Sequence, residues 1–460
     1  MAKDILALIE EAKEKAKEQL WQGKPGQRVF TAIPKYNRKR IFGTENEYGT
    51  TSITPSPTSL PNFIPNGGRI YYDCLHIEYA SPETSNPLEA IVYGKAGELL
   101  AQKYASKIYK NNVDTKGDTF GAHENYFIQT SLEEVRSIIP FLITRQIFAG
   151  AGRLKRDASY EIAQRSSKIS SAVNNKTTDD RAILNTKNEP LADLLGWWRL
   201  HLILGDANMC EVADFLKLGT TGLVLDLAED EKLPKRTYLD KKTVYDIQMI
   251  SKHLSQWMCG EEKATNIQRE YLSAAKAYQG RDPITDEILL RWESTLDALD
   301  EDPMQLIGMV DWVTKKALID QYQKQHQLPP DHPQLRNIDL QYHDTSRDGL
   351  FYTLQKQGKI ERIITDSLIE HATTHPPKDT RAFFRGNAVK RGIKEVSWDE
   401  FIDPQDGKWC ESCRAYHGNQ VIVKLNNPFN TYENLLEKLD KKEVKDKKPK
   451  KNCEENSIPF

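Results

Sequence analysis

Two short segments carry acidic side chains at the two-residue spacing of an extended strand. In GTENEYG, Glu45 and Glu47 lie two positions apart, so both side chains leave one face of a strand. In RIYYD, Tyr71 and Asp73 have the same relationship, and Glu78 follows a short way ahead. Carboxylates gathered on one face repel each other unless cations lie between them, and hard oxygen ligands select Mg²⁺ or Mn²⁺. The alternative is that these acids occupy the solvated face of an antiparallel sheet.

Two histidines and a pair of arginines are further candidate ligands. The segment GAHENYF places His123 beside an acid and an amide, a run dense in groups that bind metals and phosphates. His201 lies in the apolar run LHLILGDAN, where a core histidine bonded to backbone is an equally good interpretation. In DTRAFFRG, Arg381 and Arg385 are four residues apart, so a helix would present two guanidinium groups to a phosphate.

Charge and composition limit the classes of partner. The 64 Lys and Arg residues nearly cancel the 66 Asp and Glu residues and are spread along the chain. No basic patch for nucleic acid or an anionic membrane is predicted, and no run of eighteen apolar residues occurs. The acidic first segment is unlike a targeting signal, so we expect a cytoplasmic protein. Neither a G-x-G-x-x-G nor a P-loop motif is present, so nucleotide binding would need another chemistry.

Hydrophobic spacing predicts the elements that position these residues. Residues 3–22 read as one amphipathic helix, GTENEYG and RIYYDCLHIEYAS as strands, and residues 85–109 as a helix. Strands and helices are mixed without regular βαβ alternation, which indicates an α+β fold with a sheet covered by helices.

The character of the chain changes from about Gly386. Short strand signals and a last helix predict a small C-terminal domain, and the charged end is expected to be disordered. We therefore predict an N-terminal extension at residues 1–38, a catalytic domain at 39–385, the C-terminal domain at 386–439 and a tail at 440–460.

The segments GTENEYG, NGGRIYYD, HIEYASPE, YKNNVDTKGDTFGAHENY, FLITRQIFAGAGRL, RLHLILGDANMCE, LKLGTTGLVLDL and DTRAFFRG resemble successive blocks of the Pup ligase and Pup deamidase/depupylase family. They run in that order from about Arg40 to Trp398. The family is similar in fold to glutamine synthetase, with a curved antiparallel sheet that cradles ATP and metal ions. The resemblance therefore implies ATP and Mg²⁺ as cofactors and Pup and pupylated proteins as partners. It also makes a proteasome-associated ATPase a candidate partner.

The resemblance also assigns individual roles. Glu45, Tyr71 and Glu78 match the family's magnesium positions, and Asp73 matches its essential aspartate. Together with the candidates above, the predicted metal ligands are Glu45, Glu47, Tyr71, Glu78 and His123. The predicted nucleotide contacts are Arg69, Ser81, His201, Arg381, Arg385 and Trp398.

Three features bear on which branch of the family the chain resembles. The spacing from Asp73 to Glu78 matches the depupylase pattern D-x-x-H-P-E, one residue shorter than in the ligase. The depupylase has a long insertion between the first two strands and the ligase a helix there, but only about seventeen residues separate Gly49 from Asn66, so both are missing, and we expect helix 3–22 to cover the gap. Lys187 replaces an arginine of the family, which gives up bidentate phosphate contact.

The spacing from Asp73 to Glu78, together with the blocks DTRAFFRG and VSWDEFI, predicts a depupylase that hydrolyses the isopeptide or side-chain amide bond at the C-terminal residue of Pup, whereas the missing segment and Lys187 match neither branch. The first alternative is a ligase that joins Pup to a lysine with ATP. The second is a non-catalytic protein that binds Pup or nucleotide.

Overall fold

The computed structural model describes residues 28–50, 60–74, 76–114, 116–176, 179–187, 189, 192–235, 240–403, 408–410, 415–417 and 419–446. The predicted helix over residues 3–22 lies outside these ranges, and so does its expected docking site near the gap after Gly49 as far as it involves that helix. Residues 447–460 also lie outside them. Within the described residues, no helix is long and apolar enough to cross a membrane.

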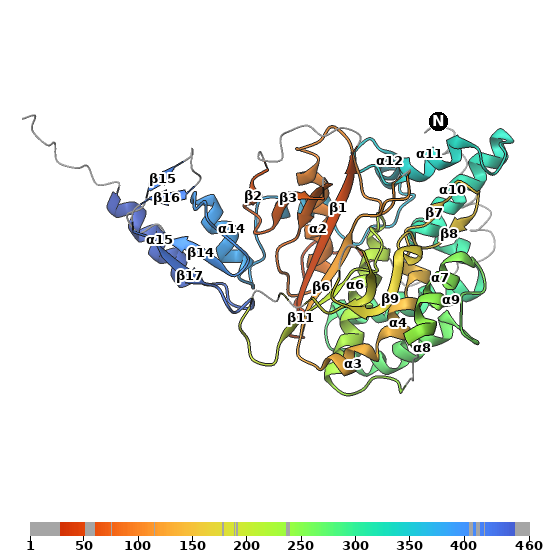
Figure 1. Cartoon of the computed structure of the whole chain (residues 1–460), viewed down its shortest axis with the longest axis horizontal. Helices are drawn as coiled ribbons and strands as arrows, with labels where there is room; N and C mark the ends of the chain where they lie inside the picture. The colour runs from red at the N-terminus through yellow and green to blue at the C-terminus, as the bar shows by residue number, and fades with distance from the viewer. Residues whose placement is uncertain are drawn as a thin grey trace, which may run out of the picture.

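A large sheet forms the centre of the molecule (Figure 1). Its nine strands follow the order β2-β3-β4-β1-β6-β11-β10-β9, and β5 pairs with the end of β1. All neighbours are antiparallel except β9 and β10, which are parallel. The strands are β1 (Ile41–Thr50), β2 (Asn62–Phe63), β3 (Arg69–Asp73), β4 (His76–Ala80), β5 (Ile108–Tyr109), β6 (Ala122–Ile128), β9 (Ile169–Asn174), β10 (Arg181–Asn185) and β11 (Trp198–Leu202). The expected α+β fold with a mainly antiparallel sheet is confirmed.

Helices pack on one face of this sheet and extend away from it (Figure 1). The helices are α2 (Pro87–Ala101), α3 (Leu132–Arg136), α4 (Ile139–Thr144), α5 (Gln146–Ala149), α6 (Glu211–Glu229), α7 (Asp240–Lys252), α8 (Ala264–Ala275), α9 (Pro283–Glu301), α10 (Asp311–His326), α11 (Pro333–Tyr342), α12 (Leu350–Lys356) and α13 (Asp366–Ala372). Two short hairpins complete this part: β7 (Arg153–Leu154) with β8 (Tyr160–Glu161), and β12 (Met258–Cys259) with β13 (Glu262–Lys263).

Helix α2 shows how the local sequence sets the limits of a helix. The side chain of Asn86 accepts a hydrogen bond from the backbone N–H of Glu89, and Pro87 follows it at the first helical position. The sequence predicted this helix over residues 85–109, which is too long at its C-terminal end. Ile108 and Tyr109 instead form β5, because they pair with Thr50 and Gly49 of β1.

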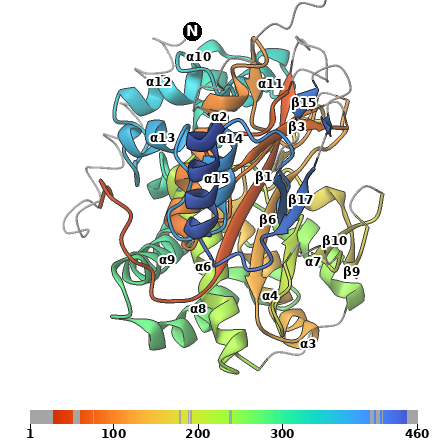
Figure 2. The same cartoon turned by 90° about the vertical axis from the view of Figure 1, so that its left-hand side faces the viewer.

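The C-terminal elements form a separate group beside β2 and β3 (Figure 1). Figure 2 views the molecule from this side, with α15 in front of α14. The group contains α14 (Ala382–Lys390), β14 (Glu400–Asp403), β15 (Lys408–Cys410), β16 (Ala415–His417), β17 (Val421–Lys424) and α15 (Glu433–Asp446). Its own small core consists of Phe384, Ala388, Phe401, Leu425, Leu436 and Leu439.

Two predicted boundaries differ from these elements. The limit between residues 385 and 386 falls inside α14, because Phe384 and Ala388 belong to the same small core. The tail predicted to be disordered from residue 440 is helical as far as Asp446. Lys and Glu, which dominate residues 440–446, have high helix propensity and continue the helix that Leu436 and Leu439 anchor.

A buried ion pair fastens the sheet to the helices behind it. Glu124 of β6 points away from the face that carries His123, and both of its oxygens accept hydrogen bonds from Arg145, at 2.6 and 2.8 Å. The two side chains are each 2% exposed. Arg145 also donates to the hydroxyl of Thr221 on α6, so a single guanidinium group connects three elements.

We predict that Arg145→Met lowers the stability by about 3 to 5 kcal/mol, because it leaves the Glu124 carboxylate buried without its cation. The shift in the urea midpoint measures this loss. The double variant Arg145→Met, Glu124→Gln should recover part of it. Arg269→Met removes a half-exposed partner of Asp297 and Asp300 and should cost less than about 1 kcal/mol. Equal losses in the two single variants would contradict the prediction.

Candidate active site

Three neighbouring strands bring Glu45, His123 and His201 together. Glu45 of β1 lies opposite His123 of β6, and β11 adds His201 opposite Asn125. The Nδ1 atom of His123 is 3.1 Å from Oε2 of Glu45, and Asn125 donates to Oε1 at 3.0 Å. The Nε2 atom of His201 is 3.7 Å from Oε2 of Glu45, too far for a hydrogen bond.

The charges of this cluster suit a bound cation. Burial lowers the pKa of His201 from 6.5 to about 4, so its ring is neutral at pH 7. Among the described residues neither ring nitrogen of His201 has a hydrogen-bond partner, although the residue is buried. Burial opposes the charge of Glu45, but the hydrogen bond with His123 and the proximity of His201 lower its pKa well below 4.5. An ionised carboxylate and a neutral imidazole with a free lone pair are a fitting pair of metal ligands.

A second group of acids lies next to the first. Glu47 of β1 pairs with Glu78 of β4 across the sheet, and Asp73 stands at the exposed end of β3. One carboxylate oxygen from each of the three lies within 4.8 Å of the others, and the same limit holds for ligand atoms of Glu45, His123 and His201. Within the described residues these two groups are the ones with metal-ligand spacing.

The second group holds more negative charge than its surroundings neutralise. Burial and the charges of Glu45, Glu47 and Asp73 raise the pKa of Glu78 to about 9. Glu47 is better compensated: burial raises its pKa, but His76 and His123 and the N–H of Gly121 together lower it. The oxygen-rich group therefore fits a hard divalent cation, which would replace the proton held by Glu78.

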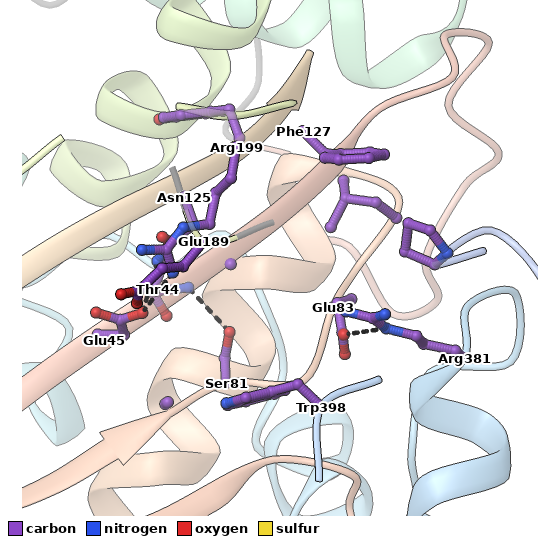
Figure 3. Close-up of a pocket in the computed structure, with 15 residues that line it drawn as sticks. Thr44, Glu45, Ser81, Glu83, Asn125, Phe127, Glu189, Arg199, Arg381 and Trp398 are labelled. Carbon is purple, nitrogen blue, oxygen red and sulfur yellow. Dashed lines mark hydrogen bonds and ion pairs between the residues drawn. The ribbon is translucent and has the colours of Figure 1, made fainter. Parts of the chain in front are cut away.

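A cavity opens beside Glu45 on the same face of the sheet (Figure 3). The first half of β1, the end of β4, the middle of β6 and the C-terminal elements form its walls. It is lined by Ile41, Gly43, Thr44, Glu45, Ala80, Ser81, Glu83, Asn125, Tyr126, Phe127, Glu189, Arg199, Arg381, Trp398 and Pro428. Apolar walls with a few polar groups and an acid cluster at one end are the features of a cofactor site.

Some predicted nucleotide contacts line this cavity and others do not. Ser81 and Trp398 lie side by side on one wall (Figure 3). The hydroxyl of Ser81 accepts from the N–H of Thr44 at 2.9 Å and donates to the carbonyl of Pro82. Arg69 is outside the lining; its guanidinium lies over the ring of Tyr71, 4.1 Å from the centroid. His201 is outside it as well and belongs with the candidate metal ligands.

The two arginines predicted to bind phosphate instead form ion pairs with Glu83, an acid that the sequence analysis did not select. Arg381 donates from Nε to Glu83 at 2.7 Å, and Arg385 donates to both oxygens of the same carboxylate. Arg385 is fully buried beneath the ring of Trp398, so it cannot present its guanidinium to a phosphate. Arg381 lines the cavity with its charge already paired (Figure 3). The helical spacing was predicted correctly, but the direction of Arg385 was not, because burial depends on the C-terminal elements.

Arg199 was also missed, although the sequence held a signal for it. It lies on β11 two residues before His201, so the alternation of a strand places both on the same face. Its Nη1 is 3.9 Å from Oε1 of Glu45, and it lines the cavity. Glu83 carried no such signal, since its partners are about 300 residues away in the chain.

Comparison with known proteins gives this site a family. A family model described as Pup-ligase protein matches residues 50–402. The chain belongs to the Pup-ligase protein family. The match begins after Glu45 and Glu47, includes the other members of the two candidate metal groups, and reaches β14.

Relatives in the Pup-ligase family carry names for both directions of one reaction. A depupylase from Acidothermus cellulolyticus is 37% identical over 394 residues, which cover 78% of this chain and 78% of that protein. A Pup-protein ligase from a Nocardioides species is 37% identical over 455 residues, which cover 87% of this chain and 99% of that protein. The crystal structure of a complex between the prokaryotic ubiquitin-like protein Pup and its ligase PafA has a TM-score of 0.75 at 29% identity, covering 90% of this chain and 99% of that one. A structure of PafA with ADP has a TM-score of 0.74 at 30% identity, covering 84% and 90%.

The ion triad of Glu83, Arg381 and Arg385 makes stability depend on acid. Burial alone would raise the pKa of Glu83, but the two arginines outweigh it and lower the pKa to about 2. A carboxylate with a lowered pKa contributes stability above its unfolded pKa, and this contribution disappears as the pH falls through the folded value. We predict that Glu83→Gln loses about 3 kcal/mol at pH 7 and flattens the stability profile between about pH 4.5 and 2. The exposed Glu437→Gln is the control, and an unchanged acid profile for Glu83→Gln in urea unfolding would contradict the prediction.

Proposed function

We propose that the chain is an ATP- and Mg²⁺-dependent depupylase, which hydrolyses the isopeptide or side-chain amide bond at the C-terminal residue of Pup. Pup and pupylated proteins are its proposed partners. On this proposal the sheet is a cradle of the glutamine-synthetase kind, with nucleotide in the cavity beside Trp398 and substrate at Asp73.

The observation that carries the proposal is the link between Asp73 and His76. These residues pair in the antiparallel register, so only positions 74 and 75 separate β3 from β4. Cys74 has a φ of 45°, as the tight turns of two-residue hairpins require. This length is the spacing of the depupylase pattern, and one more residue, as in the ligase, would move Asp73 relative to Glu78. The position of the essential aspartate therefore favours hydrolysis.

The chain's own residues divide the work between binding and chemistry. Glu45, His123 and His201 would hold one metal ion, and Glu47 and Glu78 would hold another next to Asp73. Bound Mg²⁺ supplies positive charge that stabilises a developing oxyanion and orients phosphate groups. Asp73, the exposed member, either attacks the isopeptide carbonyl or takes a proton from water. Arg199 beside Glu45 is placed to contact a nucleotide phosphate.

One observation favours the ligase as a second candidate. The chain matches two Pup-protein ligases over 98 and 99% of their length, but three depupylases over only 74 to 78%. The difference is consistent with a depupylase that has lost its long segment between β1 and β2, because about seventeen residues connect Gly49 to Asn66 here.

We predict that Asp73→Asn abolishes release of Pup from a pupylated protein, because it removes the carboxylate that attacks the isopeptide carbonyl or takes a proton from water. Nucleotide affinity should stay within about tenfold, since Asp73 lines the acid group and not the nucleotide cavity. The measurement is single-turnover cleavage followed on a gel, together with ATP titration calorimetry. Wild-type protein that attaches Pup and never releases it would refute the hydrolase, while an active Asp73→Asn would remove this residue from the mechanism.

We predict that Glu45→Gln and Glu78→Gln each weaken Mg²⁺-dependent ATP binding by about tenfold or more, because each removes an anionic oxygen ligand. Calorimetry at several Mg²⁺ concentrations distinguishes a metal effect from direct loss of nucleotide contact. The exposed Glu437→Gln should bind as the wild type does. Unchanged affinity in both variants would place the two carboxylates outside the metal sites.

A further inference from the structure

A second cavity lies at the other end of β1 from the nucleotide cavity. It has a volume of about 740 Å³ and is walled by residues 153–157, by helix α11 and by a loop that contributes Asn111, Val113, Asp114, Lys116 and Gly117. The first half of β1 lines the nucleotide cavity, whereas Asn111 of the second cavity follows β5, which pairs with the last residues of β1. The two cavities share no lining residue. The acids of β1 therefore lie between them.

The second cavity is lined by five cations: Lys116, Arg153, Lys155, Arg156 and Arg336. We call it the basic cleft. No carboxylate within the described part of the chain pairs with Lys116, Arg153 or Arg336, whereas Lys155 is 3.2 Å from the buried Glu161. The cleft therefore has positive charge that the protein does not neutralise.

The three acids in the same lining form no ion pair with Lys116, Arg153 or Arg336 among the described residues, although Asp157 is 3.8 Å from Lys155. One oxygen of Asp114 accepts three backbone N–H groups of its own loop. Asp157 accepts from the backbone and hydroxyl of Ser159. Asp339 forms an ion pair of 2.5 Å with the buried Lys315. Anionic side chains of a ligand would thus meet Lys116, Arg153 and Arg336, which have no carboxylate partner in the described part of the chain.

The floor of the basic cleft is rigid. Gln164 is buried, accepts from the N–H of Asn112 at 2.7 Å and donates to the carbonyl of Gly152. His343 is buried beside it, with Nδ1 2.7 Å from the carbonyl of Lys110 and Nε2 2.9 Å from Nζ of Lys315. These bonds hold the wall segments at fixed distances, so the cations above them are carried on a preformed surface.

The same loop connects the basic cleft to the catalytic acids. Asn112 donates to the carbonyl of Phe120, whose ring packs on His76 with centroids 4.7 Å apart. His76 is 3.3 Å from Glu47, and the next residue, Gly121, donates its N–H to Glu47. The loop that begins at the cleft with Asn111 therefore ends at Gly121, in contact with Glu47.

We propose that the basic cleft binds acidic side chains of the modified protein, next to the lysine from which Pup is released. This inference rests on the proposed function and names the part of the substrate that the cleft recognises. The acyl carbon of the isopeptide must face the nucleotide, because the phosphate that activates it in the reverse direction comes from there. The lysine nitrogen then points to the opposite side, past the acids and toward the cleft. Charge complementarity selects acidic neighbours of that lysine.

The test uses two substrates in which Pup is joined to the lysine of a short peptide. One peptide has Asp and Glu on both sides of the lysine, and the other has Asn and Gln at the same positions. We expect the wild type to cleave the acidic substrate with a kcat/KM about three- to tenfold higher at low salt, since a few partly screened charge pairs supply the difference. The preference should disappear near 1 M salt, where screening shortens the reach of charges to about 3 Å.

The double variant Arg153→Gln, Arg336→Gln should cleave both substrates equally, while keeping the wild-type rate on the neutral one. The matched control, Lys324→Gln, Lys438→Gln, removes two exposed charges outside both cavities and should keep the preference. Thermal melting verifies that each variant is folded. A wild type without preference, or a preference kept by Arg153→Gln, Arg336→Gln, would overturn the proposal.

Two further measurements distinguish binding of the modified protein from binding of Pup, and distinguish this inference from the proposed activity. Ammonia release from Pup that ends in glutamine involves no modified protein, so Arg153→Gln, Arg336→Gln should leave its rate unchanged. An equal loss there would show that the cleft binds Pup, and would overturn the proposal. Fluorescence anisotropy with the free acidic peptide needs no turnover: weaker binding by the double variant supports the cleft even if Pup is never released. Equal binding by both proteins would overturn it.

Discussion

The crowding of carboxylates on one face of the sheet is the constraint around which this molecule is organised. Glu45, Glu47, Glu78 and Asp73 converge from β1, β3 and β4, and among the described residues the cationic side chain within 4 Å of one of them is Arg199, 3.9 Å from Glu45. The consequence is visible in the pKa of Glu78, which burial and its acidic neighbours raise to about 9. Such an arrangement is stable at full charge only with added cations, so the two groups of side chains fit bound metal ions.

The direction of β1 then separates the partners of the reaction. Its first residues line the cavity with Trp398, its middle carries the acids, and its end lies near the basic cleft. On the proposed function, nucleotide, reacting bond and modified protein would lie in this order along one strand. This order makes the same scaffold suitable for forming and for breaking an isopeptide bond, which agrees with relatives named for both directions.

The cavity lined by Glu45, Ser81 and Trp398 is formed by contacts between distant parts of the chain. Glu83 follows the β-hairpin of β3 and β4, and Arg381 and Arg385 begin the C-terminal group. Their ion triad holds Trp398 against the cavity wall through the ring contact with Arg385. A change in this triad would thus alter stability and the shape of the cavity together.

The sequence by itself determined the local part of this description. The two-residue period of a strand placed Glu45 and Glu47 on one face, and Tyr71 with Asp73, because side-chain alternation needs no information from elsewhere. Apolar spacing likewise predicted α2, apart from its C-terminal end, and the order of short blocks predicted the family. Tertiary structure alone decided which strands are neighbours, and so divided the acids into two groups with His123 and His201 in one of them. It also turned Arg385 toward Glu83 and assembled the basic cleft from segments as distant in the chain as Asn111 and His343. Those features arise from long-range pairing and burial, whose free energies depend on residues that no local pattern contains.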